Sequence, residues 1–432
     1  MTAELAADTP NRLVLSPFRG LRFTGAADQA AVISPPYDMI DHDQAQRLAD
    51  GDAHNIVRVI LPELDEPDPR LRYRRAARTL REWREEGLLT LDGQAALYVY
   101  EQRVPDAPDG PGSLQRGLIG ALRLPGAAGA DGGPVHPHED VVDAVVQDRR
   151  SLMYALGANP EPILLAYQGD GAASELVEST AEQETPLAEV SGPDGVRHRI
   201  WAVTDAAALA AAAADLAGRQ ALIADGHHRY AAYRQLAALG RAGSEHGLAL
   251  LVNTERHPLR VRGIHRWLPD LAAAHAIREA EKSFTVTRVE GGYRAALEAL
   301  EATDPDTIAL AVVAGHDAWL LTDPDPKLLA EHVPQDRPEA WRRLDATVLH
   351  HALAVGVWSI PDTAQSIRYD HDARSAVTEA YRHAGIAVLL RPVPEATVHE
   401  LAAAGVMLPR KSTSFSPKPA TGLVLRLLDE ES

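Results

Sequence analysis

The 432-residue chain contains no cysteine, so disulfide bonds, thiolate metal sites and cysteine nucleophiles are excluded. It also has no apolar run of about eighteen residues, the minimum for a membrane-spanning helix. The first residues, MTAELAADTPNRL, have neither a basic start nor an apolar stretch, so no signal peptide is expected. We therefore expect a cytoplasmic protein with no membrane partner.

Lysine is scarce, and the only four are Lys282, Lys327, Lys411 and Lys418. Arginine therefore supplies most of the positive charge. The net charge of −18 repels polyanions, which argues against nucleic acid as a partner. Two of the four lysines lie close together near the C-terminus, which makes that segment unusual within this chain.

The hydrophobic content of 45% is sufficient for packed globular domains. Apolar runs typical of strands, such as PILLAYQ, QALIAD and GLALLVN, alternate with stretches of helical periodicity. This alternation predicts an α/β or mixed α+β protein whose mixed sheets have flanking helices. We expect three domains, an N-terminal one at 13–135, a central one at 136–268 and a C-terminal one at 269–432.

The segment ALIADGHHRYAAY is the strongest candidate for a functional site. An apolar strand ends at Asp225, and a helix begins after Gly226 with His227, His228 and Arg229. Helix N-termini offer backbone N–H donors, glycine permits close approach, and arginine can bind two oxygens at once. The segment therefore predicts a phosphate site. The alternative is an ordinary helix start capped by Asp225, with exposed histidines.

A second candidate is the segment PVHPHEDVVDAVVQDRRSLM. His136 and His138 could bind a metal together with Glu139, or Glu139 could act as a general base while Arg149 binds an anionic substrate. The structural alternative is a proline-rich turn followed by a surface ion pair between Asp148 and Arg149. The sequence leaves these alternatives open.

A third candidate is the polar segment LPRKSTSFSPKP, which precedes a C-terminal strand. It combines cations with hydroxyl groups, a mixture that suits an anionic ligand. The residues concerned are Arg410, Lys411, Ser412, Thr413 and Lys418. A basic surface loop is the alternative, although the scarcity of lysine elsewhere weakens it. The segment is no Walker loop, because GxxxxGK[ST] does not occur in the chain.

Two proline-rich turns near the N-terminus, SPFRG and SPPYD, contain Arg19 and Asp38. Such turns usually serve architecture, but Asp38 is a candidate carboxylate. His350 and His351 are interpreted as ordinary helix positions. The motifs GxSxG, HExxH and GxGxxG are absent, so the sequence supports no hydrolase elbow, zincin or dinucleotide site.

Taken in order, these segments resemble the signature blocks of a bacterial and archaeal family known as domain of unknown function 1015. The likeness extends from about Leu15 to Leu427. The blocks are SPFRGLRF, ISPPYD, HNIVR, LYVYEQ, PHED with QDRRSLM, NPEPI, IADGHHRY, LLVN and LPRKSTSFSPKP.

The run IADGHHRYAA is also similar to a loop of free serine kinases in the ParB/sulfiredoxin-like superfamily. This second resemblance implies a ParB/sulfiredoxin-like element around the DGHHR loop. It implies nucleotide phosphates bound by Gly226, His227, His228 and Arg229. If the site binds phosphate in this way, we expect the third candidate segment, with Lys411, Ser412, Thr413 and Lys418, to close over the anion. The kinases have a catalytic glutamate upstream of the loop, for which Glu139 is our candidate and Asp38 its rival. Asp225 and His228 complete the predicted catalytic set, and His138, Arg149 and Arg19 the substrate-binding set.

Together these resemblances lead to the hypothesis of a nucleotide-dependent phosphotransferase. It would act on the hydroxyl of free serine or a related small amino acid, or dephosphorylate phosphoserine in the reverse direction. ATP or ADP with Mg²⁺ is the implied cofactor. One alternative is a metal-dependent phosphatase or hydrolase that uses His136, His138, Glu139, Asp225, His227 and His228. Another is a non-catalytic module that binds a nucleotide or an amino acid.

Overall fold

The structure, a computed structural model, describes residues 12–25, 28–106, 112–125, 133–192, 194–363 and 365–429. Contacts divide the chain into two compact units. The first contains Met1–Leu259 and Pro417–Ser432, and the second contains Arg260–Ser416. Residues 1–11, on which the expectation of no signal peptide rests, lie outside the described residues.

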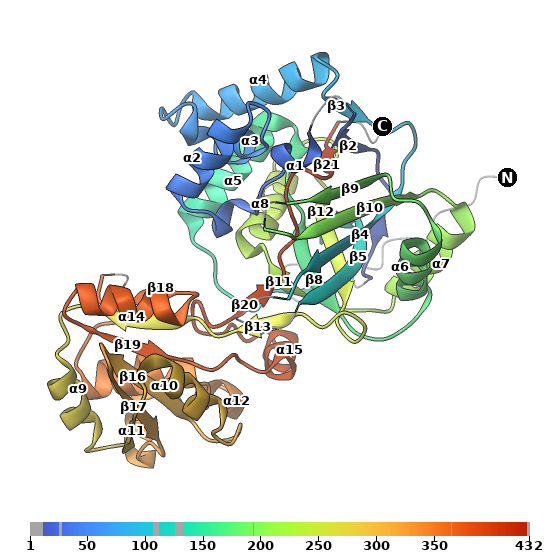
Figure 1. Ribbon diagram of the computed structural model, residues 1–432. Helices are drawn as coiled ribbons and strands as arrows, with labels where there is room; N and C mark the ends of the chain where they lie inside the picture. Colours follow the sequence, from blue (N-terminus) through green and yellow to red (C-terminus); the bar gives the residue numbers. More distant parts are fainter. Residues whose placement is uncertain are drawn as a thin grey trace. The chain divides into compact units, whose positions relative to one another are not determined.

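The first unit contains a nine-stranded sheet in the order β6, β11, β8, β12, β5, β4, β10 and β9, with β1 paired to β5 off this path (Figure 1). Two neighbouring pairs, β6 with β11 and β8 with β12, are parallel, whereas β11 and β8 are antiparallel. The sheet is therefore mixed. Its strands are β1 (Leu15–Ser16), β4 (Leu97–Val104), β5 (Ser113–Arg123), β6 (Val135–His136), β8 (Ile163–Tyr167), β9 (Ala188–Ser191), β10 (Arg197–Val203), β11 (Ala221–Asp225) and β12 (His246–Asn253).

The strands at the middle of this sheet are buried along nearly their whole length. Every residue of β8 and β11 is buried, and so are seven of the eight residues of β12. Strands covered on both faces need apolar side chains at consecutive positions rather than at alternate ones. This explains the continuous apolar runs, and the predicted strands PILLAYQ, QALIAD and GLALLVN are confirmed.

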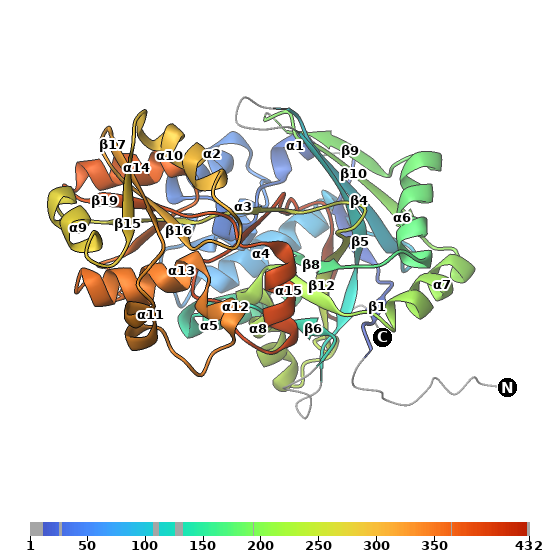
Figure 2. The same ribbon diagram turned by 90° about the horizontal axis from the view of Figure 1, so that it is seen from below.

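Four helices contribute to the hydrophobic core that this sheet shares. They are α5 (Asp143–Leu156), α6 (Ala172–Gln183), α7 (Ala206–Leu216) and α8 (His227–Ala238). Helix α5 packs along α8, and α6 packs along α7 (Figure 2). Helix α7 begins after Asp205, whose side chain accepts a hydrogen bond from the backbone N–H of Ala208 and so caps the alanine-rich segment.

A second, four-stranded sheet brings the two ends of the chain together. Its order is β3 (Leu89–Leu91), β2 (Gly20–Phe23), β21 (Leu425–Leu427) and β7 (Ala158–Asn159). The C-terminal strand thus lies between an N-terminal and a central one. The helical elements that precede β3 are α1 (Gln29–Val32), η1 (Tyr37–Met39), α2 (His42–Gly51), α3 (Val57–Ile60), η2 (Pro62–Leu64) and α4 (Arg72–Glu85).

The second unit contains an antiparallel six-stranded sheet and a separate pair of strands. The sheet order is β15 (Thr285–Val289), β17 (Asp317–Thr322), β16 (Ala309–Ala314), β19 (Ile386–Leu389), β14 (His265–Leu268) and β18 (Arg368–Asp370), and the pair is β13 (Arg260–Arg262) with β20 (Ser414–Ser416). Helices α10 (Gly292–Glu301) and α14 (Ala373–Arg382) share an alanine-rich core with this sheet.

The other helices of the second unit are α9 (Ala273–Ala280), α11 (Pro326–His332), α12 (Glu339–Arg342), α13 (Asp345–Thr347), the π-helix η3 (Val348–Val357) and α15 (Glu395–Ala403). The expected mixed α/β class with flanking helices is confirmed. Among the helices of the described ranges, none is long and apolar enough to cross a membrane.

The division into two units differs from the three domains predicted at 13–135, 136–268 and 269–432. The first predicted boundary falls inside the nine-stranded sheet, because β5 from the N-terminal part pairs with β12 from the central part. The C-terminal strand β21, which the prediction placed in the last domain, belongs to the first unit, because it pairs there with β2 and β7. Both differences come from long-range strand pairing, which local sequence patterns do not encode.

Candidate functional site

The DGHHR loop joins β11 to α8, as the sequence predicts. Asp225 is the last residue of β11, and α8 begins at His227. Gly226 has a φ of +93°, and a Cβ atom there would lie 2.8 Å from Cγ2 of Ile163, so glycine is required at this turn. Among the described residues, no side chain caps the first turn of α8, and the partial positive charge of a helix N-terminus favours an anion there.

Asp225 lies between two cations. Its Oδ1 is 2.5 Å from Nζ of Lys418, and its Oδ2 pairs with Arg229. Burial raises the pKa of Asp225, but Lys418 and Arg229 together outweigh burial and hold that pKa below its usual range. Asp225 is therefore a buried carboxylate that stays ionised.

Arg229 does not present its guanidinium to a ligand, contrary to the predicted clamp on two phosphate oxygens. Only 2% of the residue is exposed, and its Nη1 donates to the carbonyl of Pro162 at 2.5 Å while Nη2 binds Asp225. These contacts use the fork that the clamp would need. Arg229 instead anchors Asp225 and joins α8 to the segment that enters β8.

The doubled histidines are both hydrogen-bond acceptors through Nε2. The backbone N–H of His138 donates to His227 at 3.3 Å, and that of Val142 donates to His228 at 3.0 Å. A ring nitrogen that accepts a hydrogen bond carries no proton, which assigns the Nδ1–H tautomer to a neutral ring. Burial lowers the pKa of His227 to about 3, so this ring is neutral near pH 7.

These two hydrogen bonds hold the PHED segment against the DGHHR loop. Glu139 lies between their two donors, and its side chain is partly exposed. The rings of His138 and His227 also meet edge to face, with centroids 4.5 Å apart. The structure therefore brings the predicted segment to the predicted loop. In the sequence, His138 is 89 residues from His227, and Val142 is 86 residues from His228.

Lys418 reaches the loop from a C-terminal segment that is fixed on both sides. The side chain of Gln115 donates to the carbonyl of Pro417 at 2.9 Å, and the backbone N–H of Ala420 donates to the hydroxyl of Tyr100 at 3.2 Å. Burial lowers the pKa of Lys418, but Asp225 and Asp38 outweigh burial and raise it overall. Lys418 is therefore a protonated ammonium held at the loop.

Asp38 also lies at this place. Its Oδ1 is 4.0 Å from Nζ of Lys418, and about a third of its side chain is exposed. It belongs to the short 3₁₀ helix η1, directly after Tyr37. Asp38 and Glu139, the two candidates for a general base, are thus both near the DGHHR loop.

Two residues beside the loop were not singled out from the sequence. Tyr37 packs against the guanidinium groups of Arg149 and Arg229, whose Cζ atoms lie 4.3 and 5.9 Å from its ring centroid. Glu161 is buried and accepts a hydrogen bond from the backbone N–H of Tyr37 at 3.0 Å. Their signals were present in the blocks ISPPYD and NPEPI, where each stands beside prolines, but neither pattern reveals a partner.

The sequence predicts that Arg149 binds a substrate carboxylate. In the structure, however, Arg149 is buried. Its Nε and Nη2 bind the neighbouring Asp148, and its Nη1 donates to the carbonyl of Ile60 at 2.7 Å. These contacts compete with the predicted role because they occupy all three nitrogens. Arg149 therefore packs inside the protein, against the ring of Tyr37.

Arg19 belongs to a different set of contacts in the first unit. Its Nε donates to the carbonyl of Asp92 at 2.9 Å, and the carboxylate of Asp92 binds Arg22 and Tyr98. This set connects β2 with the turn after β3. The hydrogen bond from Arg19 to Asp92 is a structural contact within this set. The predicted contact of Arg19 with substrate stays a prediction.

The predicted KST segment is divided between the two units. Lys411, Ser412 and Thr413 belong to the second unit, whereas Lys418 belongs to the first. Ser412 is buried, and its hydroxyl donates to the carbonyl of Pro409 at 2.6 Å. The first unit therefore supplies the DGHHR loop with Lys418 from this segment.

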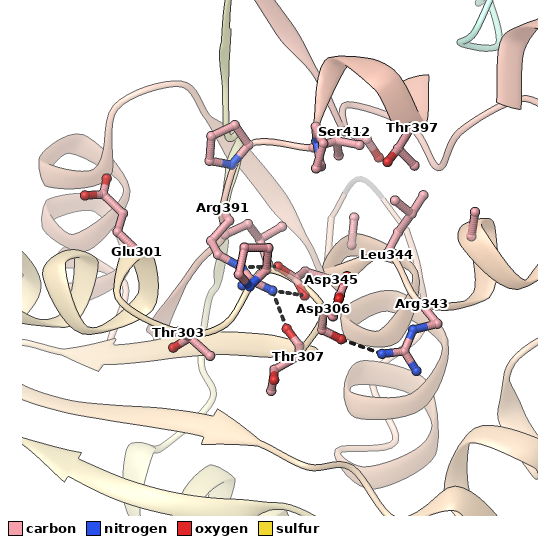
Figure 3. Close-up of a pocket in the computed structure, with 17 residues that line it drawn as sticks. Glu301, Thr303, Asp306, Thr307, Arg343, Leu344, Asp345, Arg391, Thr397 and Ser412 are labelled. Atoms are coloured by element: carbon pink, nitrogen blue, oxygen red, sulfur yellow. Dashed lines mark hydrogen bonds and ion pairs between the residues drawn. The ribbon is translucent and has the colours of Figure 1, made fainter. Parts of the chain in front are cut away.

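Ser412 lines a cavity of about 450 Å³ in the second unit (Figure 3). Arg391 is central to it and binds the carboxylate of Asp345 and the backbone carbonyls of Asp304 and Thr307. Burial outweighs the effect of Arg391 and raises the pKa of Asp345. This cavity contains none of the residues of the DGHHR loop, and Arg391 and Asp345 in its lining are paired with each other.

The metal-site alternative lacks a ligand cluster. Within the ranges that the structure describes, no group of three or more His, Asp and Glu side chains could hold a metal ion. The Nε2 atoms of His227 and His228 also accept backbone hydrogen bonds, so these lone pairs are already used. The set of six predicted ligands, which includes His136 and His138, therefore does not form a metal centre among the described residues.

The solved structures that are similar to this chain at low identity include those of three proteins. A conserved hypothetical protein from Pyrococcus furiosus is 17% identical, with a TM-score of 0.34, over 69% of this chain and 94% of that protein. A free serine kinase in complex with AMP is 17% identical, with a TM-score of 0.33, over 67% of this chain and 89% of the kinase. SbnI from Staphylococcus aureus, truncated at its C-terminus, is 11% identical, with a TM-score of 0.35, over 73% and 90%.

A search of curated proteins found no match. The model of one protein family, however, matches residues 15–347, most of the chain, and this confirms the resemblance seen in the sequence blocks. The chain therefore belongs to the family described as protein of unknown function, DUF1015.

Proposed function

We propose that this protein is a nucleotide-dependent phosphotransferase that acts on the hydroxyl of free serine or a related small amino acid. The observation that carries the proposal is the meeting of three distant segments at the uncapped start of α8. Lys418 binds Asp225, Asp38 lies beside Lys418, and the segment that carries Glu139 is bonded to the doubled histidines. A cation, two carboxylates and backbone donors are the groups that phosphoryl transfer requires.

In this proposal the phosphate is bound by the backbone of α8 and by two side chains of the site. In this arrangement the partial positive charge at the first turn of α8 attracts the anion, and Nδ1–H of His227 supplies a neutral donor. Lys418 supplies positive charge. Arg229 contributes indirectly, because it holds Asp225 and hence the loop.

Glu139 is the proposed general base, and Asp38 remains its rival. The base takes the proton of the acceptor hydroxyl. At the same time the oxygen of that hydroxyl forms a bond to the terminal phosphorus of the nucleotide. The bond from that phosphorus to the bridging oxygen breaks, and the shortened nucleotide leaves with the electron pair. Mg²⁺ supplies charge neutralisation when it is bound with the nucleotide, and the partly exposed carboxylate of Asp38 is the oxygen ligand that suits it.

The reverse reaction, from phosphoserine to a nucleotide, uses the same groups. We place the reaction in the cytoplasm, with a nucleotide and a small-molecule substrate as partners. The metal-dependent hydrolase is not proposed, because the described residues contain no ligand cluster for it. A non-catalytic nucleotide or amino-acid binding module remains the competing outcome of the experiment.

The experiment first measures thermal shifts with ATP, ADP, serine and phosphoserine in the presence of Mg²⁺, because ligands of the folded state raise the melting temperature. Transfer of radiolabelled phosphate from ATP to serine and other hydroxy amino acids follows. Glu139→Gln should abolish transfer but leave nucleotide binding nearly unchanged. Glu175→Gln, at an exposed position in α6, is the matched control and should behave like the wild type.

Two results would count against the proposal, and a third would change the assignment of the general base. If no nucleotide shifts the melting temperature and no phosphate is transferred, the phosphotransferase is excluded. If nucleotide binds but no hydroxy amino acid is phosphorylated, the binding module is the better description. If Asp38→Asn abolishes transfer whereas Glu139→Gln does not, the general base is Asp38.

A further inference from the structure

Glu161 is a buried carboxylate at the entry to β8. Only 2% of the residue is exposed. Its Oε1 accepts two hydrogen bonds, from the backbone N–H of Tyr37 at 3.0 Å and from the hydroxyl of Thr421 at 3.3 Å. A single oxygen atom therefore joins two segments that are far apart in the chain.

These two segments carry two charged groups of the candidate site, Asp38 and Lys418. Tyr37 directly precedes Asp38, and Thr421 lies three positions after Lys418. The segments also pair with each other, because the backbone N–H of Thr421 donates to the carbonyl of Ser34 at 2.8 Å. Glu161 thus binds both segments, and Oδ1 of Asp38 lies 4.0 Å from Nζ of Lys418.

The backbone at Glu161 extends the same connection to α8. The hydroxyl of Tyr233 donates to the carbonyl of Glu161 at 2.9 Å, and Arg229 donates to the carbonyl of Pro162. Both donors belong to the helix that begins at the DGHHR loop. Residues 161 and 162 therefore connect all three elements, η1, α8 and the C-terminal segment.

Glu161 lies close to two buried arginines. Burial outweighs the effect of Arg229 and Arg149 and raises the pKa of Glu161 above its usual value. A small cavity lined by Glu161, Arg149, Arg229 and Tyr233 lies next to the carboxylate, with about 10 Å³ of space. Since neither arginine presents its guanidinium to solvent, these charges act inside the protein and not on a ligand.

We infer that Glu161 is a positioning residue, which fixes Asp38 and Lys418 relative to each other and to the start of α8. The effect on phosphate transfer rests on the proposed function. The positioning itself does not, because the surroundings of Lys418 can be measured in the protein without a ligand.

The chain offers internal references for such a measurement, since it has only four lysines. The protein is treated with limiting acetic anhydride, and the acetylation rate of each lysine is measured by peptide mass spectrometry. Lys418 should react slowly, because only 13% of its side chain is exposed and two carboxylates raise its pKa. Lys282, Lys327 and Lys411 serve as references in the same sample.

Thr421→Val removes the hydroxyl that binds Glu161 and preserves the shape of the side chain. We expect the acetylation rate of Lys418, relative to the three references, to rise about threefold or more, since half a pKa unit changes the fraction of free amine by that factor. Thr180→Val, at a buried position of α6, is the matched control and should leave the ratio unchanged. Glu161→Gln retains an acceptor oxygen and should raise the ratio less than Glu161→Ala.

The inference is overturned if Thr421→Val and Glu161→Ala fold, as judged by circular dichroism, and leave the Lys418 ratio at its wild-type value. Thr421→Val alone decides the question if Glu161→Ala does not fold. If the ratio rises as expected but the wild type binds no nucleotide, the proposed function fails and the positioning role stands. In an active protein, Thr421→Val should lower kcat for transfer more than it changes the KM for serine.

Discussion

The ammonium group of Lys418 lies 2.5 Å from Oδ1 of Asp225, the residue that ends β11. The pair is largely buried, and Arg229 binds the other oxygen of the same carboxylate. Breaking a buried ion pair by removing one partner usually costs several kcal/mol, because the other charge is left without compensation. The role of Lys418 in folding must therefore be separated from its role in binding.

A double-mutant cycle separates these roles. Lys418→Met should lower the free energy of unfolding by about 2–4 kcal/mol, because Asp225 loses one of its two cations, and Asp225→Asn should cost less when it is added to Lys418→Met than in the wild type. Binding of ADP, measured by calorimetry, should weaken at least about tenfold in both proteins. Lys327→Met is the control. Recovery of ADP binding in the double variant would show that Lys418 acts only through the fold.

The local part of this site could be predicted from the sequence. An apolar strand, a glycine and a helix start follow one another in ALIADGHHRY, and these short-range patterns give β11, Gly226 and α8. The scarcity of lysine elsewhere in the chain also indicates that Lys418 has a specific role. These signals lie within a few residues of each other or in the composition, so no knowledge of the tertiary structure is needed to read them.

The partners of the charged residues could not be predicted. Arg229 points inward because the carbonyl of Pro162 lies behind it, and that depends on the antiparallel pairing of β11 with β8. Similarly, the KST segment looks continuous in sequence, but the boundary between the two units falls between Ser416 and Pro417. Contacts of this kind arise from the packing of distant segments, which residue spacing does not report.

Gly226 should not tolerate a side chain. With φ at +93° and Cγ2 of Ile163 only 2.8 Å from the place that a Cβ atom would occupy, Gly226→Ala combines backbone strain with a steric clash. We expect a loss of about 1–3 kcal/mol in the free energy of unfolding, measured in urea, together with weaker ADP binding. Gly218→Ala is the control, because no atom of the described residues lies within 4 Å of its added Cβ. Equal stability of the two variants would contradict the required left-handed turn.

Arg229 should affect stability before it affects binding. Arg229→Lys cannot bind Asp225 and Pro162 with one planar fork, so we expect a loss of about 2–3 kcal/mol in the free energy of unfolding. Arg234→Lys, further along α8, should change stability little. If Arg229→Lys is as stable as the wild type but loses ADP binding, the guanidinium contacts the phosphate after all.

Recognition of the anion should depend little on pH, because His227 is already neutral. Burial lowers its pKa to about 3, so it does not become a cation between pH 5.5 and 8. Sulfate is a suitable probe, since its own charge does not change in this range. We expect its dissociation constant, measured by calorimetry, to vary less than about threefold over this interval. Binding that tightens tenfold on acidification would indicate a protonated histidine at the anion.

Acid should destabilise the first unit through His198. Burial lowers the pKa of this histidine to about 4, and its Nδ1 lies 2.8 Å from the hydroxyl of Tyr100. The unfolded chain, with a histidine pKa near 6.5, binds more protons than the folded state between pH 6.5 and 4. Stability from this group is therefore complete above pH 6.5 and is lost as the pH falls toward 4.

His198 should contribute about 2 kcal/mol to the decrease in unfolding free energy between pH 7 and pH 5. His198→Gln should reduce the decrease by that amount, whereas His42→Gln, at an exposed position in α2, should not. Urea titrations at both pH values measure the difference, and parallel pH dependence in the wild type and His198→Gln would show that the ring is charged in the folded protein.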